Sequence, residues 1–232
     1  MSNSPDSKAN IRMDRDVDSL KDLARAMAKL AEAILAKSLR AAWEADPALG
    51  AEVKGDDLEI DRIDVAIDDA VLRVLALDAP VASDLRTVIA VKAIATDLER
   101  VGDLARNIAS CARRLSEMDS FAFPAKIQTL ADQARHSLRQ ANQSFNDLDP
   151  ALARSVLDGD DEIDDLEAEI IRAAIDSLAH HPESTKQVVD LIFIAQSLER
   201  IGDHATNIAE ETILVAEAKN LKHSEKLARA DR

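Results

Sequence analysis

The chain has 232 residues, with 44 acidic and 29 basic side chains and a formal net charge of −15. Affinity for phosphate backbones comes from Lys and Arg, so we expect no nucleic-acid partner. The acidic surface fits either an attraction for cations or a basic protein surface, or simple solubility, and charge alone does not separate these alternatives. The single cysteine, Cys111, excludes an internal disulfide and a zinc site built on cysteines.

Hydrophobic residues make up 47% of the chain, whereas aromatic residues make up 2%, with only five glycines and six prolines. So few turn-forming residues predict an all-α fold of long helices. Prolines divide the chain into six segments, and we expect helices at roughly 12–45, 48–78, 82–117, 125–148, 151–180 and 184–219. Residues 1–16 show no secretory signal, and the most apolar stretch, 188–194, is too short to cross a bilayer. We therefore expect a cytoplasmic protein.

The chain contains an internal duplication. Leu98-Glu-Arg-Val-Gly-Asp recurs as Leu198-Glu-Arg-Ile-Gly-Asp, and Asp46-Pro-Ala-Leu recurs as Asp149-Pro-Ala-Leu. We interpret this as a tandem duplication of a three-helix bundle, with repeats at 12–120 and 121–220 and a flexible charged tail at 221–232. Apolar residues three and four apart predict a buried seam along the third helix of each repeat. In the first repeat the seam comprises Val91, Ile94, Leu98, Val101, Ala105, Ile108, Ala112 and Leu115.

Each repeat also carries an acidic row on its third helix. Residues four apart project from the same side of a helix. The rows are Glu99, Asp103 and Asn107 in the first repeat, and Glu199, Asp203 and Asn207 in the second. At about 100° per residue, both rows lie roughly 130–170° from the seam. We therefore expect them to face outward, which argues against a buried di-metal centre of the ferritin type.

A second acidic row follows the second helix of each repeat. It consists of Asp57, Asp61, Asp64 and Asp68 in the first repeat, and of Asp160, Asp164 and Glu167 in the second, where Ile171 replaces the fourth acid. Like charges at this spacing cost a helix about 0.2–0.5 kcal/mol per pair unless a cation neutralises them. Oxygen ligands suit Mg²⁺, Ca²⁺, Mn²⁺, iron or zinc, and His204 adds a nitrogen donor in the second repeat.

A solvated acidic face without any metal is the alternative interpretation of these rows. Against it stand the recurrence of the rows on two helices of each repeat and the glycines within them. A glycine inside a helix costs about 1 kcal/mol relative to alanine, so Gly102 and Gly202 indicate a close backbone approach. That approach serves either a ligand or a tight helix–helix contact. Phosphate-loop, dinucleotide and nucleophile-elbow motifs are absent, and we expect a protein that is not an enzyme.

The doubled signature at 98–109 and 198–209 resembles the paired signatures of the PhoU family of phosphate-uptake regulators. Asp64-Val-Ala-Ile-Asp68 and Ala82-Ser-Asp-Leu-Arg86 also resemble that family, and the similarity covers about residues 15–220. The resemblance implies a tandem pair of three-helix bundles and a non-enzymatic negative regulator of the phosphate starvation response. Its implied partners are the ATPase subunit of the high-affinity phosphate ABC transporter and a phosphate-sensing histidine kinase, through which it is peripheral to the membrane. A homodimer is left open.

The resemblance also implies iron or zinc clusters on the bundle surface, held by acidic pairs four residues apart. Carried over by position, the pairs are Glu99 with Asp103, Glu199 with Asp203, Asp64 with Asp68, and Asp160 with Asp164, accompanied by Asp61 and Glu167. Because Ile171 interrupts the row, the resemblance implies fewer metals or weaker binding in the second repeat. Two alternatives are a metal-dependent phosphohydrolase and a helical scaffold without metal.

Overall fold

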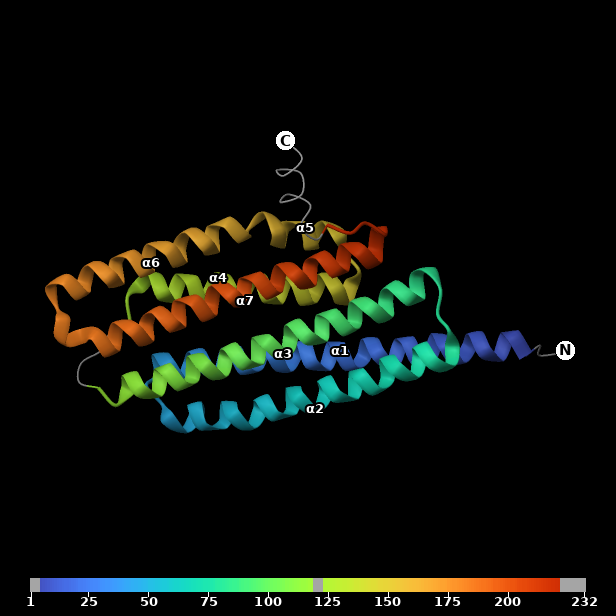
Figure 1. The fold of residues 1–232 in the computed structure, drawn as a ribbon, viewed down its shortest axis with the longest axis horizontal. Helices are drawn as coiled ribbons and strands as arrows, with labels where there is room; N and C mark the ends of the chain where they lie inside the picture. Colours follow the sequence, from blue (N-terminus) through green and yellow to red (C-terminus); the bar gives the residue numbers. More distant parts are fainter. Residues whose placement is uncertain (1–4, 119–122, 222–232) are drawn as a thin grey trace.

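The structure, a computed structural model, describes residues 5–118 and 123–221 as a set of long helices that run side by side (Figure 1). The first half consists of α1 (Pro5–Trp43), α2 (Pro47–Asp78) and α3 (Ala82–Ser116). The second half consists of α4 (Ala125–Asp147), α5 (Pro150–Asp158), α6 (Asp160–His180), the short 3₁₀ helix η1 (Pro182–Ser184) and α7 (Thr185–Glu217). The described residues contain no strand, so the prediction of an all-α fold is confirmed.

The duplicated Asp-Pro-Ala-Leu segments begin corresponding helices of the two halves. The side chain of Asp46 accepts hydrogen bonds from the amides of Ala48 (2.8 Å) and Leu49 (3.2 Å) at the start of α2. Asp149 caps α5 in the same way. The proline that follows each cap suits the first helical position, since its missing N–H would have no partner there.

The single helix expected over 151–180 is divided in two at Gly159. The amide of Gly159 bonds to the carbonyl of Val156 at 3.2 Å, three residues back, which tightens the last turn of α5. Glycine has a low helix propensity, so a break is inexpensive at this position. The expectation of one continuous helix was therefore wrong at this residue, and α6 begins directly at Asp160.

The two halves meet along α3 and α7, which pack together over most of their length, and α1 also contacts α4. The seam expected along α3 is buried throughout, from Val91 to Leu115. The helices α2 and α6 lie at opposite edges of the molecule (Figure 1), and α2 contacts only α1 and α3 among the described helices. The acidic rows of α3 and α7 therefore lie beside the outer helices α2 and α6, which carry the other two acidic rows.

Two further sequence expectations concern the ends and the membrane. The tail expected at 221–232 lies outside the described residues beyond Leu221. In the ranges 5–118 and 123–221, no helix combines the length and the apolar content that crossing a bilayer requires.

Candidate metal centre

In each half the acidic rows lie where the outer helix crosses the helix that carries the duplicated signature. The crossing of α2 with α3 is at Gly102, and that of α6 with α7 is at Gly202. A Cβ added to Gly102 would lie 2.9 Å from Oδ1 of Asp57 and 2.9 Å from Cδ1 of Ile60. A Cβ at Gly202 would lie 3.1 Å from Cδ1 of Ile163. The close approach expected from these glycines is confirmed, and it brings α2 onto α3 and α6 onto α7.

This contact changes the expected orientation of the carboxylates. The side chains of Glu99 and Asp103 are only 24% and 28% exposed, because α2 covers the flank on which they lie. Asp57 is buried, with 2% of its surface exposed. The expectation of an outward-facing row was therefore wrong in part: Glu99 and Asp103 lie at the contact between α2 and α3, whereas Asp203, the counterpart of Asp103, is exposed as expected. Angles measured on one helix could not show which neighbour covers that flank.

In the first half, basic side chains of α3 neutralise these acids. Arg106 donates to Oδ2 of Asp57 at 2.7 Å and to Oδ1 of Asp103 at 2.5 Å. Arg100 lies 3.3 Å from the carboxylate of Glu99 and donates to Asp103 at 3.1 Å. The guanidinium groups therefore take the place that a bound cation would occupy.

The same is true further along α2. The ammonium group of Lys92 lies 3.1 Å from Oδ1 of Asp64 and 2.6 Å from Oδ1 of Asp68. One lysine of α3 thus satisfies two acids of α2. Asp61 is exposed between these groups. Together, Arg100, Arg106 and Lys92 give the first half an internal set of counter-charges.

In the described part of the second half, the corresponding acids form no such ion pairs. Carboxylate oxygens of Asp160, Asp164 and Asp203 all lie within 4.8 Å of one another. Oδ1 of Asp160 is buried without a hydrogen-bond partner. Among the described residues, no ion pair reaches these three or the neighbouring Glu167 and Glu199 (the set that we call the second-half acidic cluster).

The difference between the halves follows from two positions of the duplicated sequence. Thr206 stands where the first half has Arg106, and Ile192 stands where it has Lys92. Asp57, Asp61 and Asp103 correspond to Asp160, Asp164 and Asp203, so these acids are retained while two of the three bases are replaced. The third, Arg100, is retained as Arg200. The sequence interpretation did not compare Arg106 and Lys92 with their counterparts in the second half. A position-by-position comparison of the bases would have revealed the asymmetry.

The pKa values reflect this uncompensated charge. Burial, and after it the carboxylates of Asp203, Asp164, Glu167 and Asp160, together raise the pKa of Glu199 to about 7. Burial and then Asp164 raise the pKa of Asp160 to about 6. Burial also raises the pKa of Asp57, but there Arg106 acts in the opposite direction. The second-half acidic cluster thus favours a bound proton or cation.

His204 does not take part in this cluster. Its Nδ1 lies 2.8 Å from Oδ1 of Asp97 on α3, and the amide of Asn207 donates to the same oxygen at 3.1 Å. The two residues fasten α7 to α3 across the junction of the halves. The expectation that His204 adds a nitrogen ligand was therefore wrong, as was the placement of Asn207 in the acidic row.

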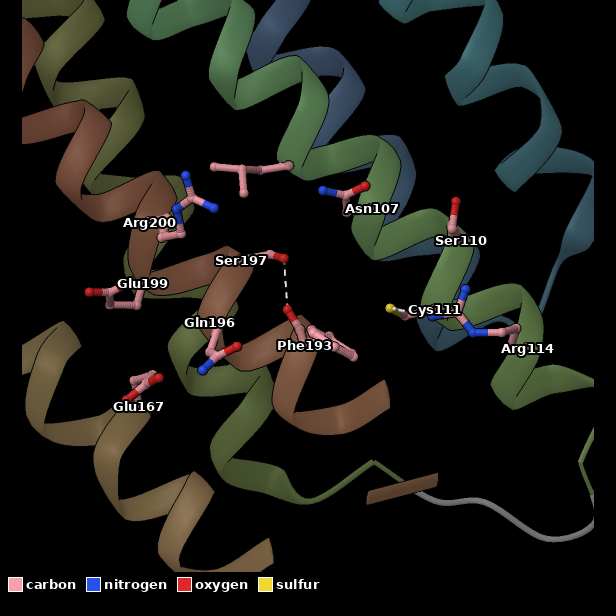
Figure 2. A pocket seen from close by; sticks show the side chains of 11 residues that line it. Asn107, Ser110, Cys111, Arg114, Glu167, Phe193, Gln196, Ser197, Glu199 and Arg200 are labelled. Atoms are coloured by element: carbon pink, nitrogen blue, oxygen red, sulfur yellow. Dashed lines mark hydrogen bonds between the residues drawn. The ribbon is translucent and has the colours of Figure 1, made fainter. Parts of the chain in front are cut away.

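The contact of His204 and Asn207 with Asp97 has an equivalent position, in which α3 and α7 exchange their roles. A groove lies at that position. By the duplication, Ser197 corresponds to Asp97, Leu104 to His204 and Asn107 to Asn207. The hydroxyl group of Ser197 donates to the carbonyl of Phe193 within its own helix, so it closes no contact with α3. The result is a groove of about 740 Å³ between α3 and α7. Figure 2 shows Glu167 and Glu199 at one end of it and Arg114 at the other.

The donor set of the second half fits a cation that prefers oxygen ligands. Three aspartate side chains converge, one with a buried unpaired oxygen, and Glu199 and Glu167 lie beside them. Such hard donors suit Mg²⁺, Mn²⁺, Ca²⁺ and iron, with zinc as a borderline case. The first half fits a cation only if Arg106 and Lys92 withdraw from the acids that they neutralise.

Comparison with known families decides the identity of the fold. The family model described as the PhoU domain matches the chain twice, at residues 24–112 and 127–212. The chain belongs to the PhoU family. The resemblance read from the doubled signature is confirmed, and so is the tandem duplication of a helical bundle.

Curated members of the PhoU family are similar over most of the chain. One from Pseudomonas putida is 35% identical over 199 residues, which cover 85% of this chain and 78% of the relative. One from Zymomonas mobilis is 33% identical over 208 residues, covering 90% and 88% of the two chains. Both are described as phosphate-specific transport system accessory protein PhoU homologs.

Solved PhoU structures have the same fold. The crystal structure of PhoU from Pseudomonas aeruginosa superposes with a TM-score of 0.86 at 30% identity, covering 89% of this chain and 99% of that one. A phosphate transport system regulatory protein from Streptococcus pneumoniae reaches a TM-score of 0.83 at 24% identity.

Proposed function

We propose that this PhoU-family chain is an accessory protein of a phosphate transport system and a negative regulator of the phosphate starvation response. In this proposal it works in the cytoplasm as an adaptor between the ATPase subunit of the transporter and a sensor histidine kinase. Support comes from the relatives in Pseudomonas putida and Zymomonas mobilis, which are phosphate-specific transport system accessory protein PhoU homologs.

The adaptor, in this proposal, carries a bound cation in its second half. The observation that carries this step is the convergence of Asp160, Asp164 and Asp203 without any basic partner among the described residues. A divalent or ferric ion would supply the missing positive charge there. It would join α6, which provides two of the three aspartates, to α7, which provides the third.

The first half plays a different part in the same proposal. Arg106 and Lys92 of α3 supply permanent positive charge to acids of α2, so that α2 stays on α3 without a metal. The contact between α2 and α3 is thus constitutive, whereas the contact between α6 and α7 responds to a cation. This arrangement suits a regulator, because loading one half changes the charge of one outer helix only.

Elemental analysis of two matched variants tests the cation site. Asp164→Asn with Asp203→Asn removes two charges from the second half, and Asp61→Asn with Asp103→Asn removes their counterparts from the first. We expect the purified second-half variant to lose bound metal while the first-half variant retains the wild-type content. Equal metal content in all three proteins would show that the site is misassigned.

A reporter of a phosphate-starvation promoter tests the regulatory role separately. In a strain without its own PhoU, the wild-type chain is expected to restore repression in phosphate-rich medium. The second-half variant is expected to restore less repression at equal protein levels. A wild-type chain that leaves the promoter fully active would refute the regulatory proposal, whatever its metal content.

A further inference from the structure

The groove between α3 and α7 contains polar groups that the protein itself leaves unused. Among the described residues, the side chains of Asn107, Gln196 and Arg200 have no hydrogen-bond or ion-pair partner. Figure 2 shows the side chains of Arg200 and Asn107 extending toward one another across the groove. Small-molecule sites are typically recesses of about 300–1,000 Å³ with a few polar groups, and this groove has about 740 Å³. It therefore offers both room and hydrogen-bond donors to a small ligand.

The orientation of Arg200 differs from that of its counterpart in the first half. Arg100 lies 3.3 Å from the carboxylate of Glu99 and donates to Asp103 at 3.1 Å. Arg200 lines the groove instead and, among the described residues, pairs with neither of the equivalent acids on its own helix. A guanidinium group presents a planar set of donors that matches phosphate oxygens. Arg200 thus offers an uncommitted positive charge to an anionic group in the groove.

The groove also contains an exposed aromatic ring. Phe193 is 52% exposed, and Figure 2 shows its side chain extending from α7 toward Cys111 on α3. Its counterpart in the first half is Ala93, so the ring is not part of the duplicated pattern. The nearby Arg114 is neutralised by Asp190, and this part of the groove therefore carries little net charge. An exposed ring in such a place is a surface on which a nucleobase can stack.

The spacing of the ring and the guanidinium group limits the length of the ligand. Phe193 and Arg200 are seven residues apart on α7, which corresponds to about 10 Å along the helix axis. A nucleoside diphosphate or triphosphate spans this distance from its base to its outer phosphates, whereas a nucleoside does not. Gln196 lies between the two residues, and its amide is free to bond the sugar or the edge of the base. This spacing favours a nucleotide with more than one phosphate.

Acidic groups at the same end of the groove determine the form of that ligand. Glu167 and Glu199 lie there, as Figure 2 shows. They would repel a bare phosphate chain, but they complement a chain that carries Mg²⁺. Mg²⁺ is usually bound through one or two carboxylates together with phosphate oxygens. A guanidinium group beside two carboxylates therefore fits a magnesium nucleotide better than free phosphate.

We propose that the groove between α3 and α7 binds the magnesium complex of a nucleoside diphosphate or triphosphate. The base stacks on Phe193. The outer phosphates lie between Arg200 and Asn107, and the Mg²⁺ faces the carboxylates of Glu167 and Glu199. This inference goes beyond the proposed function and does not depend on it, because the nucleotide brings its own cation. Since α3 and α7 belong to different halves, the bound nucleotide contacts both.

Calorimetric titration of the full chain in excess Mg²⁺ tests the proposal. We expect ATP and GTP both to bind in the micromolar range, because stacking on a ring discriminates little between bases. Adenosine lacks the phosphates and magnesium pyrophosphate lacks the base, so each is expected to bind at least tenfold more weakly than ATP. With EDTA in place of Mg²⁺, the affinity for ATP should fall at least tenfold. No binding of either nucleotide, or equal binding of pyrophosphate, adenosine or metal-free ATP, would overturn the proposal.

Three variants test the placement of the ligand in the groove. Phe193→Ala and Arg200→Gln are each expected to weaken the binding of magnesium ATP by about tenfold. Arg100→Gln, the matched change in the first half, is expected to leave it unchanged. Phe193→Ala should not affect the weak binding of pyrophosphate, which has no base to stack. Circular dichroism checks that each variant remains helical. Wild-type affinity for magnesium ATP in both groove variants would overturn the assignment of the site.

Discussion

Arg106 of α3 bonds the buried carboxylate of Asp57 on α2 at 2.7 Å, and in the second half the position of Arg106 is taken by Thr206. This single exchange leaves Asp160, the counterpart of Asp57, with a buried oxygen that has no hydrogen-bond partner. The protein therefore contains two versions of one acidic site. In the closed version, Arg106 of α3 pairs with Asp57 and Asp103. In the open version, no basic side chain of the described residues pairs with Asp160 or Asp203.

Thr206→Arg should close the open version. A guanidinium at this position would reach Asp160 and Asp203 as Arg106 reaches Asp57 and Asp103. We expect this variant to bind no divalent cation in the second half and to be more stable than the metal-free wild type. Calorimetric titration with Mn²⁺ and thermal unfolding in a chelator measure the two effects. Retention of wild-type affinity would contradict the placement of the site.

Arg106→Thr should open the closed version. Without its arginine, Asp57 is a buried carboxylate with one partner fewer, and we expect a loss of about 1–3 kcal/mol in the free energy of unfolding in a chelator. Divalent cations should restore part of this loss by binding Asp57 and Asp103. The control is Arg113→Ala, which removes only an exposed pair with Glu117. Chemical denaturation with and without Mn²⁺ distinguishes the two variants.

The sequence predicted the duplicated helical fold because its signals are local. The Asp-Pro-Ala-Leu caps, the seam of α3 and the two signatures each lie within one segment of the chain. The break at Gly159 was missed because a glycine in a helical pattern is compatible with both a continuous and a divided helix.

The chemistry of the site was predicted only in part, because it depends on contacts between helices. The acids lie on the flanks that the sequence indicated, but their partners Arg106 and Lys92 were not identified. The distance from Lys92 to Asp68 is set by the register of α2 against α3, which spacing within one helix does not determine. Likewise, His204 proved to face Asp97 across the junction of the halves.

The stability of the metal-free protein should depend on the protonation of Glu199. Its pKa in the folded state is raised to about 7 by burial and by neighbouring carboxylates, so the folded state holds a proton that the unfolded state releases. Stability from this group is complete below its ordinary pKa and is lost as the pH rises through about 7. In a chelator, we expect the free energy of unfolding to fall between about pH 5 and pH 8.

Glu199→Gln is the matched variant for this pH dependence. It keeps the shape of the side chain but cannot ionise, so the decline with pH should be smaller. Added divalent cation should also reduce the decline in the wild type, because cations compete with protons for the cluster. A wild-type stability that rises over the same pH range would contradict the raised pKa.

The two signature glycines should differ in their tolerance of alanine. At Gly102 the added Cβ meets Oδ1 of Asp57, which Arg106 holds in place, and we expect Gly102→Ala to cost about 1–3 kcal/mol. At Gly202 the nearest atom is the end of the Ile163 side chain at 3.1 Å. There the helix propensity of alanine offsets the contact by about 1 kcal/mol. Paired denaturation curves should show the larger loss for Gly102→Ala.

A buried ion pair should contribute to holding the halves together. Nε of Arg114 on α3 donates to both oxygens of Asp190 on α7, at 2.9 and 3.1 Å, and Asp190 is buried. Because Arg114 is itself partly exposed, we expect Asp190→Asn to cost about 2 kcal/mol. The neighbouring Arg113→Ala should stay within about 0.5 kcal/mol. Equal losses in the two variants would argue against a role for this pair.

The most direct test of the asymmetry between the halves is the metal content of the purified, untagged chain, measured beside Asp164→Asn with Asp203→Asn and beside Asp61→Asn with Asp103→Asn. We expect bound metal in the wild type and in the first-half variant, and none in the second-half variant. Metal that persists in the second-half variant but disappears from the first-half variant would contradict the assignment of the open site.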